Sequence, residues 1–394
     1  MKRGKMKKIS QKIYLYFFTL VLLIGFALNI KNLTDSIVTV VPEEKFDAWA
    51  ILINVKFNEN IAGKYSFIDA NGMVHKILGQ RAMNEAVKLD NKSVFVPMEY
   101  SDTSSNAMKV SDLKDILNEM GIPLLYVQTP YDVCRFDESN AAKADCSNTV
   151  ADEFVANLRQ NGVSVLDLRD ELHNDGLDHY EAFYKTDHHW TAETAFWAFG
   201  TINEEIGSTL QTTIPDEYLT LDSYKCENYE GVLGSTGRKT GQYYCGLDNL
   251  NIYSPVFDTS ITASYPTKNY SATGTYDEVV LDRTHLEGDN LFEMLQYNVY
   301  TGNDRDITIY TNENAPVDAK ILFVKDSFFR PVLAFMSTVY RECVAVDLRY
   351  LETSLIDIIE EEKPDMVVIE YNPYILTDDN VFEWQKTADE ENNN

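Results

Sequence analysis

Short apolar runs recur along this chain and alternate with stretches of helical spacing, and this alternation narrows the folds open to it more than any other feature. Brief runs rich in valine, leucine and isoleucine are typical of buried strands. They are Ser93–Pro97, Pro123–Val127, Val163–Asp167, Ile321–Val324, Cys343–Val346 and Met366–Ile369. Between them, Ser111–Met120 ends at Gly121, and Val150–Gln160 spaces its apolar residues at a helical period. The pattern predicts an α/β fold with a parallel sheet flanked by helices.

The first 31 residues are typical of a membrane anchor. Residues 1–12 hold six basic residues and no acidic one, and Ile13–Ile30 is an 18-residue run without a charge. A secretory signal peptide would have a shorter apolar run and a small-residue cleavage site, and the residues after Ile30 do not provide one. We therefore expect a cytoplasmic basic tail (1–12), an uncleaved transmembrane anchor (13–31) and a single-pass cell-membrane protein whose C-terminal domain is extracytoplasmic.

The residues after the anchor divide into a stalk, one large domain and a polar tail. Residues 32–60 show no clear period and are expected to form a juxtamembrane stalk. The main folded domain is expected over residues 61–385, and the polar residues 386–394 are typical of a disordered tail. Between about 205 and 318 the sequence becomes rich in Tyr, Thr, Asn and Gly, which predicts an irregular insertion that leans toward β structure.

The chain is strongly acidic beyond its basic start. Without residues 1–12 it carries 28 basic residues (34 minus 6) against 62 acidic ones, a formal charge of about −34. Nucleic acid is therefore not expected as a partner. The same field would repel strongly anionic polymers at long range, although salt screens much of it. We expect a neutral or weakly charged substrate.

Five cysteines are present, and an extracytoplasmic domain would hold them in an oxidising compartment. Cys134 with Cys146, and Cys226 with Cys245, would close short loops, so these two disulfides are expected. Cys343 lies in an apolar run and is expected to be a buried free thiol.

The pentapeptide Thr186–Trp190 (TDHHW) holds the first candidate for chemistry. In an extended backbone, side chains two residues apart point the same way, so Asp187 and His189 would share one face and His188 would point to the other. Asp187 would then orient and polarise His189. Thr191 is a candidate N-cap for the helix that follows, which puts the pair on a strand-to-helix connection, where catalytic residues often lie.

A second candidate lies far downstream, in the sequence Val324–Phe328 (VKDSF). Ser327 follows the apolar run Ile321–Val324 and precedes a helical pattern, so it falls at the carboxyl end of a strand. A serine hydroxyl needs a base to take its proton and a carboxylate to orient that base. Ser327, His189 and Asp187 would fill these three roles if the fold brings them together.

These two motifs carry a family resemblance. The residues DHHW at 187–190, followed far downstream by a strand and KDSF at 325–328, resemble the DHHW group of SGNH-hydrolase-like proteins. The order Asp-x-His and then Ser is also similar to that of the extracytoplasmic O-acetyltransferases that modify alginate and related polysaccharides. The resemblance covers about residues 60–385 in element order and is specific at the two motifs. It implies an SGNH-hydrolase-like, flavodoxin-like parallel sheet.

The same resemblance implies a membrane-anchored O-acetyltransferase or acetylesterase that acts on a cell-surface or secreted polysaccharide. Ser327 would be the nucleophile, His189 the base and Asp187 its orienting acid, with an acetyl-serine intermediate that passes its acyl group to a sugar hydroxyl or to water. No cofactor is implied. Members of the family often work beside a membrane-bound O-acyltransferase that supplies acyl groups. Lys325 stands where the commoner motif has glycine, and the family's early Gly-Asp-Ser and Gly-x-Asn blocks are not evident, so their roles are not carried over.

Four further residues are candidates for substrate binding. Asn372 and Tyr131 lie just beyond two expected strands, at the sheet edge where α/β proteins bind ligands. Arg238 belongs to a Gly-rich basic loop that would line the cleft and contact an acceptor. Trp190 would stack on a sugar ring, but an aromatic residue beside a helix start more often fills the core.

Alternatives to a serine enzyme remain open. Asp187, His188 and His189 have side chains that bind metals. Adjacent histidines point apart in an extended chain, however, and the other histidines form no supporting cluster, so no metal is expected. A catalytically inactive carbohydrate-binding or envelope-assembly protein would keep the same fold. Transfer to a sugar and hydrolysis are both consistent with these residues.

Overall fold

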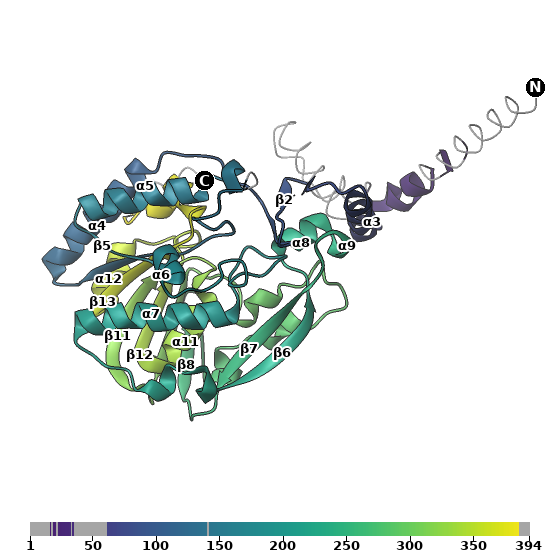
Figure 1. Ribbon diagram of the computed structural model, residues 1–394. Coiled ribbons are helices and arrows are strands. Elements are labelled where there is room, and N and C mark those ends of the chain that lie inside the picture. Colours follow the sequence, from purple (N-terminus) through teal and green to yellow (C-terminus); the bar gives the residue numbers. More distant parts are fainter. Residues whose placement is uncertain are drawn as a thin grey trace, which may run out of the picture. The chain divides into compact units, whose positions relative to one another are not determined.

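The computed structural model describes residues 16, 19–20, 23–32, 34, 61–139 and 142–385 (Figure 1). The chain divides into two compact units, Met1–Asn71 and Gly72–Asn394, and the central sheet belongs to the second. The predicted basic tail, part of the predicted anchor, most of the predicted stalk and the predicted polar tail lie outside the described residues. Within the part that is described, no helix is both long and apolar enough to cross a membrane.

An eight-stranded sheet forms the centre of the second unit, in the order β5-β4-β13-β11-β12-β10-β8-β9. Its strands are β4 (Leu124–Gln128), β5 (Ser164–Asp167), β8 (Ile261–Tyr265), β9 (Tyr270–Gly274), β10 (Ile307–Asn312), β11 (Val317–Val324), β12 (Tyr340–Val346) and β13 (Met366–Tyr371). The first five strands in the spatial order are parallel, and the last three continue the sheet in antiparallel pairing. Five of the six predicted apolar runs form the parallel part, as expected for strands buried on both faces.

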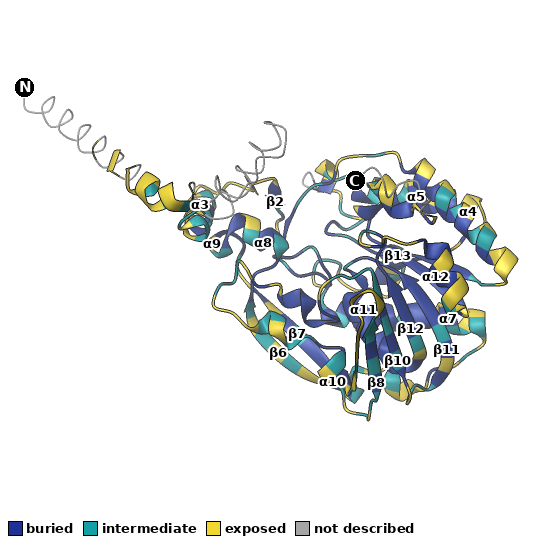
Figure 2. Cartoon of the chain, turned by 180° about the vertical axis from the view of Figure 1, so that it is seen from behind, coloured by how far each residue is buried: buried dark blue, intermediate teal, exposed yellow. Residues whose placement is uncertain are grey.

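Alternate residues of the central strands pack against helices on opposite faces of the sheet. Ile321 and Phe323 of β11 share a core with α7 and α11, whereas Leu322 and Val324 share a core with α4, α5 and α12. These helices are α4 (Ser104–Met120), α5 (Ser147–Gln160), α7 (Ala192–Leu210), α11 (Phe329–Val339) and α12 (Leu355–Glu362). Figure 2 shows the central strands buried and the outer sides of α4 and α5 exposed. Each fully buried Val, Leu, Ile or Phe side chain in these cores contributes roughly 1.5–3 kcal/mol to the free energy of unfolding.

The sheet is mixed, whereas the sequence predicted a parallel sheet with a separate insertion. Part of the insertion forms β8, β9 and β10, and β10 pairs antiparallel with β12. Burial alternates along β10, which is the pattern of a strand that is covered on one face. Such a strand has no continuous apolar run, so the sequence did not reveal it. The same insertion contains an antiparallel ribbon of β6 (Tyr224–Val232) and β7 (Asp248–Pro255).

The remaining elements lie outside the central sheet. The predicted strand Ser93–Pro97 becomes part of a small antiparallel sheet of β1 (Ala82–Met83), β2 (Ala86–Lys88) and β3 (Val94–Phe95). The other α-helices with described bounds are α3 (Lys64–Ile77), α6 (Leu168–Asn174), α8 (Ser235–Thr240), α9 (Gln242–Cys245) and α10 (Tyr276–Val279). Short 3-10 helices are η1 (Ala142–Ala144), η2 (Asp216–Tyr218), η3 (Leu221–Ser223), η4 (Pro266–Lys268), η5 (Arg283–Leu286), η6 (Gln296–Val299), η7 (Ile375–Thr377) and η8 (Asp379–Phe382).

The two predicted disulfides are not formed, because all five cysteines are free thiols. In the β6–β7 ribbon, Cys226 lies opposite Tyr253, while Cys245 lies beyond the other end, where Val232 pairs with Asp248. The strand from residue 226 to residue 232 spans roughly 20 Å at about 3.3 Å per residue, which is too far for a disulfide. Cys134 and Cys146 are partly buried and unpaired, and Cys343 is a buried free thiol, as predicted.

Candidate active site

The segment before α7 is a closed loop that presents Asp187 and His189. Phe183 and Trp190 form an isolated antiparallel bridge, and the Tyr184 N–H donates to the His189 carbonyl at 3.2 Å. Thr191 caps α7 through its side chain, which accepts from the Thr194 N–H at 3.3 Å, as the sequence predicted. The loop is therefore fixed both by its own pairing and by the helix start that follows it.

His189 stands between an aspartate and a serine. Its Nδ1 lies 2.5 Å from Asp187 Oδ1, and its Nε2 lies 2.8 Å from Ser327 Oγ. The carboxylate can accept only from an Nδ1–H, which leaves Nε2 to accept from the Ser327 hydroxyl. The structure thus brings the three predicted residues together in the order that nucleophilic catalysis requires, although 138 residues separate the histidine from the serine.

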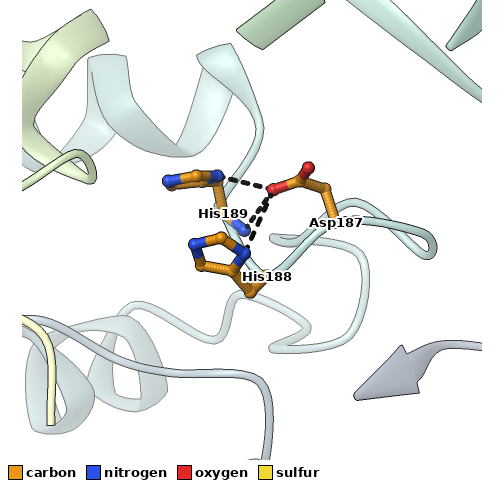
Figure 3. Close-up of side chains that lie close together, drawn as sticks. All are labelled: Asp187, His188 and His189. Atoms are coloured by element: carbon orange, nitrogen blue, oxygen red, sulfur yellow. Dashed lines mark hydrogen bonds and ion pairs between the residues drawn. The ribbon is translucent and has the colours of Figure 1, made fainter. Parts of the chain in front are cut away.

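His188 does not point away from the pair as an extended backbone would have it. Its ring centroid lies 3.9 Å from that of His189, and its Nδ1 lies 3.6 Å from Asp187 Oδ1 (Figure 3). The backbone bends over residues 185–189 instead of extending, so the expected alternation of side chains is lost. Burial, with the charge of His189, lowers the pKa of His188 to about 3. The ring is therefore neutral near pH 7, and its Nδ1 lies 2.7 Å from Ser235 Oγ.

Asp187 is a buried carboxylate that is held on both oxygens. Oδ1 accepts from the backbone N–H of His189 at 3.1 Å as well as from its ring, and Oδ2 accepts from the Ser235 N–H at 2.7 Å. Burial alone would raise the pKa of this carboxyl. The charge and hydrogen bond of His189, the nearby His188 and the Ser235 N–H outweigh burial and hold the pKa well below its usual range. Asp187 is therefore ionised at neutral pH and can stabilise a protonated His189.

Ser327 lies in the turn between β11 and α11, and the buried Asp326 fixes that turn. The Asp326 carboxyl accepts from the Phe328 N–H at 2.8 Å, from the Asn372 N–H at 2.8 Å and from the Asn372 side-chain amide at 2.5 Å. Asn372 follows β13, the neighbour of β11, so these bonds tie two adjacent strand ends together. Asn372, predicted to bind substrate, instead supports the residue beside the nucleophile.

The other side of the turn is held through the Phe328 carbonyl. It accepts from Trp190 Nε1 at 2.9 Å and from the Tyr297 hydroxyl at 3.2 Å. The prediction that Trp190 stacks on a sugar is corrected by its burial, because the side chain is 0% exposed and offers no ring face to a ligand. Tyr297 stacks on His189, with ring centroids 3.9 Å apart and planes 13° apart. The base and the nucleophile are thus positioned by the same two aromatic residues.

Lys325, which stands in place of the commoner glycine, belongs to a buried charge cluster. Its Nζ lies 3.1 Å from Asp304 Oδ1, and Arg330 and Arg349 bind the same carboxylate at 2.6 and 3.1 Å. Arg349 also binds Asp347 at 2.6 Å. Burial would raise the pKa of Asp304, but Lys325 and the arginines hold it well below its usual range. The lysine therefore has a structural partner and joins the ends of β11 and β12 to the loop that carries Asp304.

A cavity of about 300 Å³, here called the catalytic cavity, opens onto Ser327 and His189. Of the four residues predicted to bind substrate, Arg238 is the one that lines it, and its guanidinium donates to the Met294 carbonyl at 2.8 Å. Tyr131 lines a neighbouring cavity instead. The predicted basic loop is thus at the site, and the other predicted contacts are not.

Sequence reasoning missed four residues that shape this site. Ser235 lies in the Gly-rich loop that was predicted to line the cleft, but no sequence motif identifies it as the hydrogen-bond partner of Asp187. Tyr297 and Asp304 lie in the insertion and carry no motif. Arg330 had a usable signal, because it follows Ser327 by three residues and a helix start places such residues on one side.

The donor set Asp187, His188 and His189 has its ligand atoms within 4.8 Å of one another, as a metal site would. Both nitrogens of His189 and both oxygens of Asp187 are already hydrogen-bonded, however, to each other, to Ser327 and to Ser235. A cation bound there would compete with the bonds that link the base to the nucleophile. The arrangement fits a proton relay better than a metal centre.

Comparison with protein families identifies the fold. Residues 91–273 match the family described as SGNH hydrolase-like domain, acetyltransferase AlgX. This part of the chain is similar to that family. The predicted resemblance is confirmed by this match, which includes Asp187 and His189 and ends before Ser327.

Two solved structures share the fold of this chain at low sequence identity. PatB1 of Bacillus cereus is 19% identical with a TM-score of 0.63, over 76% of this chain and 100% of that chain. A DHHW family protein from Eubacterium siraeum is 17% identical with a TM-score of 0.59, over 78% of this chain and 98% of that chain. No curated protein is similar enough in sequence to count as a relative.

Proposed function

We propose that this protein is a serine-dependent O-acetyltransferase or acetylesterase that acts on a cell-surface or secreted polysaccharide. The observation that carries the proposal is the hydrogen-bonded series from Asp187 through His189 to Ser327, which opens onto the catalytic cavity. The match of residues 91–273 to a family named for an acetyltransferase supports the acyl chemistry. We further propose that the domain lies outside the cell behind an N-terminal membrane anchor, which the basic residues 1–12 and the uncharged run Ile13–Ile30 support. A membrane-bound O-acyltransferase is the proposed acyl donor.

The reaction begins when Ser327 Oγ attacks the carbonyl carbon of an acetyl ester while His189 Nε2 takes the hydroxyl proton. The ionised Asp187 stabilises the imidazolium that forms. Ser327 directly precedes the N-terminus of α11, where the helix dipole favours the negative charge of an oxyanion. The bond to the donor oxygen then breaks, and that oxygen takes the proton from His189. The product is acetyl-Ser327 and the free donor alcohol.

In the second half-reaction, His189 takes a proton from a sugar hydroxyl or from water, and that oxygen attacks the acetyl carbonyl. The Ser327 oxygen leaves and regains its proton from His189. Transfer and hydrolysis use the same groups, so the outcome depends on whether a sugar or water occupies the cavity.

Hydrolysis of 4-nitrophenyl acetate by the full chain tests this proposal. We expect Ser327→Ala and His189→Ala to lower turnover by about 10³-fold or more, because each removes a participant in the same step. Ser271→Ala is the matched control, since Ser271 is exposed on the edge strand β9, and it should hydrolyse the ester at the wild-type rate. Equal turnover by wild type and Ser327→Ala would refute the role of this serine. An inactive but folded wild type would favour the carbohydrate-binding or assembly protein.

A further inference from the structure

A second cavity of about 450 Å³ lies beside the catalytic cavity and shares His188 and Ser235 with it. It is called here the tyrosine cavity, after Tyr131 and Tyr374 in its lining. Its volume falls in the range of small-molecule sites, about 300–1,000 Å³. Nothing in the proposed triad chemistry uses this space.

The sheet topology places the tyrosine cavity at the edge where ligands bind in α/β proteins. Tyr131 and Asp132 follow β4, and Tyr374 follows β13, while Ser327 follows β11. These three strands are parallel neighbours, so their carboxyl ends meet at one edge of the sheet. The buried Phe328 ring packs between residues of the two linings, because its centroid lies 5.9 Å from those of both Tyr131 and His188.

Asp132 is a buried polar group whose carboxyl has no partner. Its side chain lines the tyrosine cavity, the residue is 8% exposed, and its carboxyl makes no hydrogen bond or ion pair within the part of the chain that the structure describes. Burying a polar group without a partner costs about 1–3 kcal/mol, so such groups usually face a ligand or water. Burial, with the charges of Asp187 and Asp145, raises the pKa of this carboxyl well above its usual range. A protonated carboxyl can both donate and accept a hydrogen bond, as a sugar hydroxyl requires.

The remaining lining suits an uncharged ring. Tyr374 is 62% exposed, although large aromatic side chains are normally buried, and Tyr131 is partly exposed beside it. Glu85 and Lys239 are exposed at the rim and carry opposite charges. The site thus combines aromatic faces, one buried hydrogen-bonding group and no net charge at its rim.

We infer that the tyrosine cavity binds a neutral pyranose unit of the acceptor glycan, adjacent to the unit that is acylated at Ser327. The Tyr374 ring packs on the apolar face of the sugar, and the Asp132 carboxyl bonds its hydroxyls. That this sugar belongs to the acceptor rests on the proposed function, whereas sugar binding in the cavity does not depend on it.

Saturation-transfer NMR titration of the full chain tests the inference without any catalysis. The probes are cellopentaose and chitopentaose, which are neutral, and pentagalacturonate, which is anionic. We expect at least one neutral probe to bind more tightly than the anionic one. Tyr374→Ala and Asp132→Ala should each weaken that binding about tenfold or more. Asp132→Asn keeps a donor and an acceptor and should stay within about threefold of wild type.

Two controls separate this inference from protein damage and from the proposed function. Tyr270→Ala removes a tyrosine of similar exposure, 48%, on the edge strand β9 and should bind as wild type does. Ser327→Ala should also bind the sugar, because Ser327 does not line the tyrosine cavity. A wild-type protein that binds sugar but forms no acyl-enzyme would overturn the proposed function and leave the tyrosine cavity assigned as a sugar site. The inference fails if neither neutral probe binds, if pentagalacturonate binds best, or if Tyr374→Ala and Asp132→Ala bind like wild type.

Discussion

At the scale of single residues, the position of Asp187 depends on the absence of a side chain at residue 234. A Cβ on Gly234 would lie 2.5 Å from the Thr186 carbonyl oxygen and 2.7 Å from Asp187 Cα, and closer still to Asp187 Cβ. Contacts this short cannot exist, so the loop that holds Asp187 against His189 would have to move. The glycine is required here by space and not by its backbone angles, since its φ is −71°.

We therefore expect Gly234→Ala to lower turnover of 4-nitrophenyl acetate by about 10²-fold, because a shift of about 1 Å at a catalytic group costs this much. It should also lower the free energy of unfolding by about 1–3 kcal/mol through overpacking. The matched control is Gly200→Ala in α7, where an added Cβ meets no atom within 4 Å. That variant should keep full activity and gain up to about 1 kcal/mol of stability. Wild-type turnover by Gly234→Ala would contradict this account of the loop.

At the scale of elements, the turn between β11 and α11 is held by a carboxyl that never reaches the cavity. Asp326 accepts three hydrogen bonds, from Phe328 and from Asn372, and so joins the ends of β11 and β13. Replacing it with alanine leaves three buried donors without an acceptor, each at a cost of about 1–3 kcal/mol.

Asp326→Ala is accordingly expected to lose about 3 kcal/mol or more of unfolding free energy in urea titrations, with a loss of esterase activity in the fraction that folds. Asp318→Ala, at an exposed position of the same strand, should change stability by less than about 0.5 kcal/mol. If both variants unfold at the wild-type urea midpoint, the turn is held by something other than Asp326.

At the scale of the whole molecule, the half-buried His188 makes stability depend on pH. The pKa of His188 falls from 6.5 to about 3 on folding, so between these values the unfolded chain binds the extra proton. The unfolding free energy is not reduced by His188 above about pH 6.5. It falls progressively as the pH drops from 6.5 toward 3, because the unfolded chain takes up the proton first. Asp132 and Glu370, whose pKa values are raised by burial, act in the opposite direction. The slope of the unfolding free energy against pH is therefore the sum of these opposing effects.

The effect of His188 is isolated by comparing His188→Gln with wild type. Between pH 4 and pH 6, the unfolding free energy of the variant should rise less steeply with pH, by up to about 1.4 kcal/mol per pH unit, which is one proton. Urea titrations at four or five pH values measure the slope. Parallel curves for the two proteins would show that His188 does not take up a proton on unfolding.

The sequence revealed those parts of the fold whose residues are buried on two faces. β4, β13 and the second halves of β11 and β12 are continuous apolar runs. They were predicted as strands of one parallel sheet together with β5, a shorter edge strand whose Ser164 is exposed. The strands β8, β9 and β10 were not recognised as part of that sheet, because each mixes polar and apolar residues and none contains a continuous apolar run. Pairing across the sheet is also non-local, and spacing in the sequence does not encode it.

The candidate site was predictable where chemistry demands a residue type and unpredictable where packing decides. Asp187, His189 and Ser327 are recognisable because they lie in short motifs beside expected strand ends and helix starts. The burial of Trp190 and the turn of Asn372 toward Asp326 depend on neighbours far away in the chain. Cys226 and Cys245 were paired on loop length, whereas the register of the β6–β7 ribbon keeps them apart.

The most direct test of the central claim is intact-mass analysis of the full chain after brief exposure to 4-nitrophenyl acetate, followed by mapping of the modified peptide. The account predicts one added acetyl group on wild type, located on Ser327, and none on Ser327→Ala. His189→Ala should acquire it at least about 10³-fold more slowly. An acetyl group found on another residue, or an equal adduct on Ser327→Ala, would contradict the assignment of Ser327 as the nucleophile.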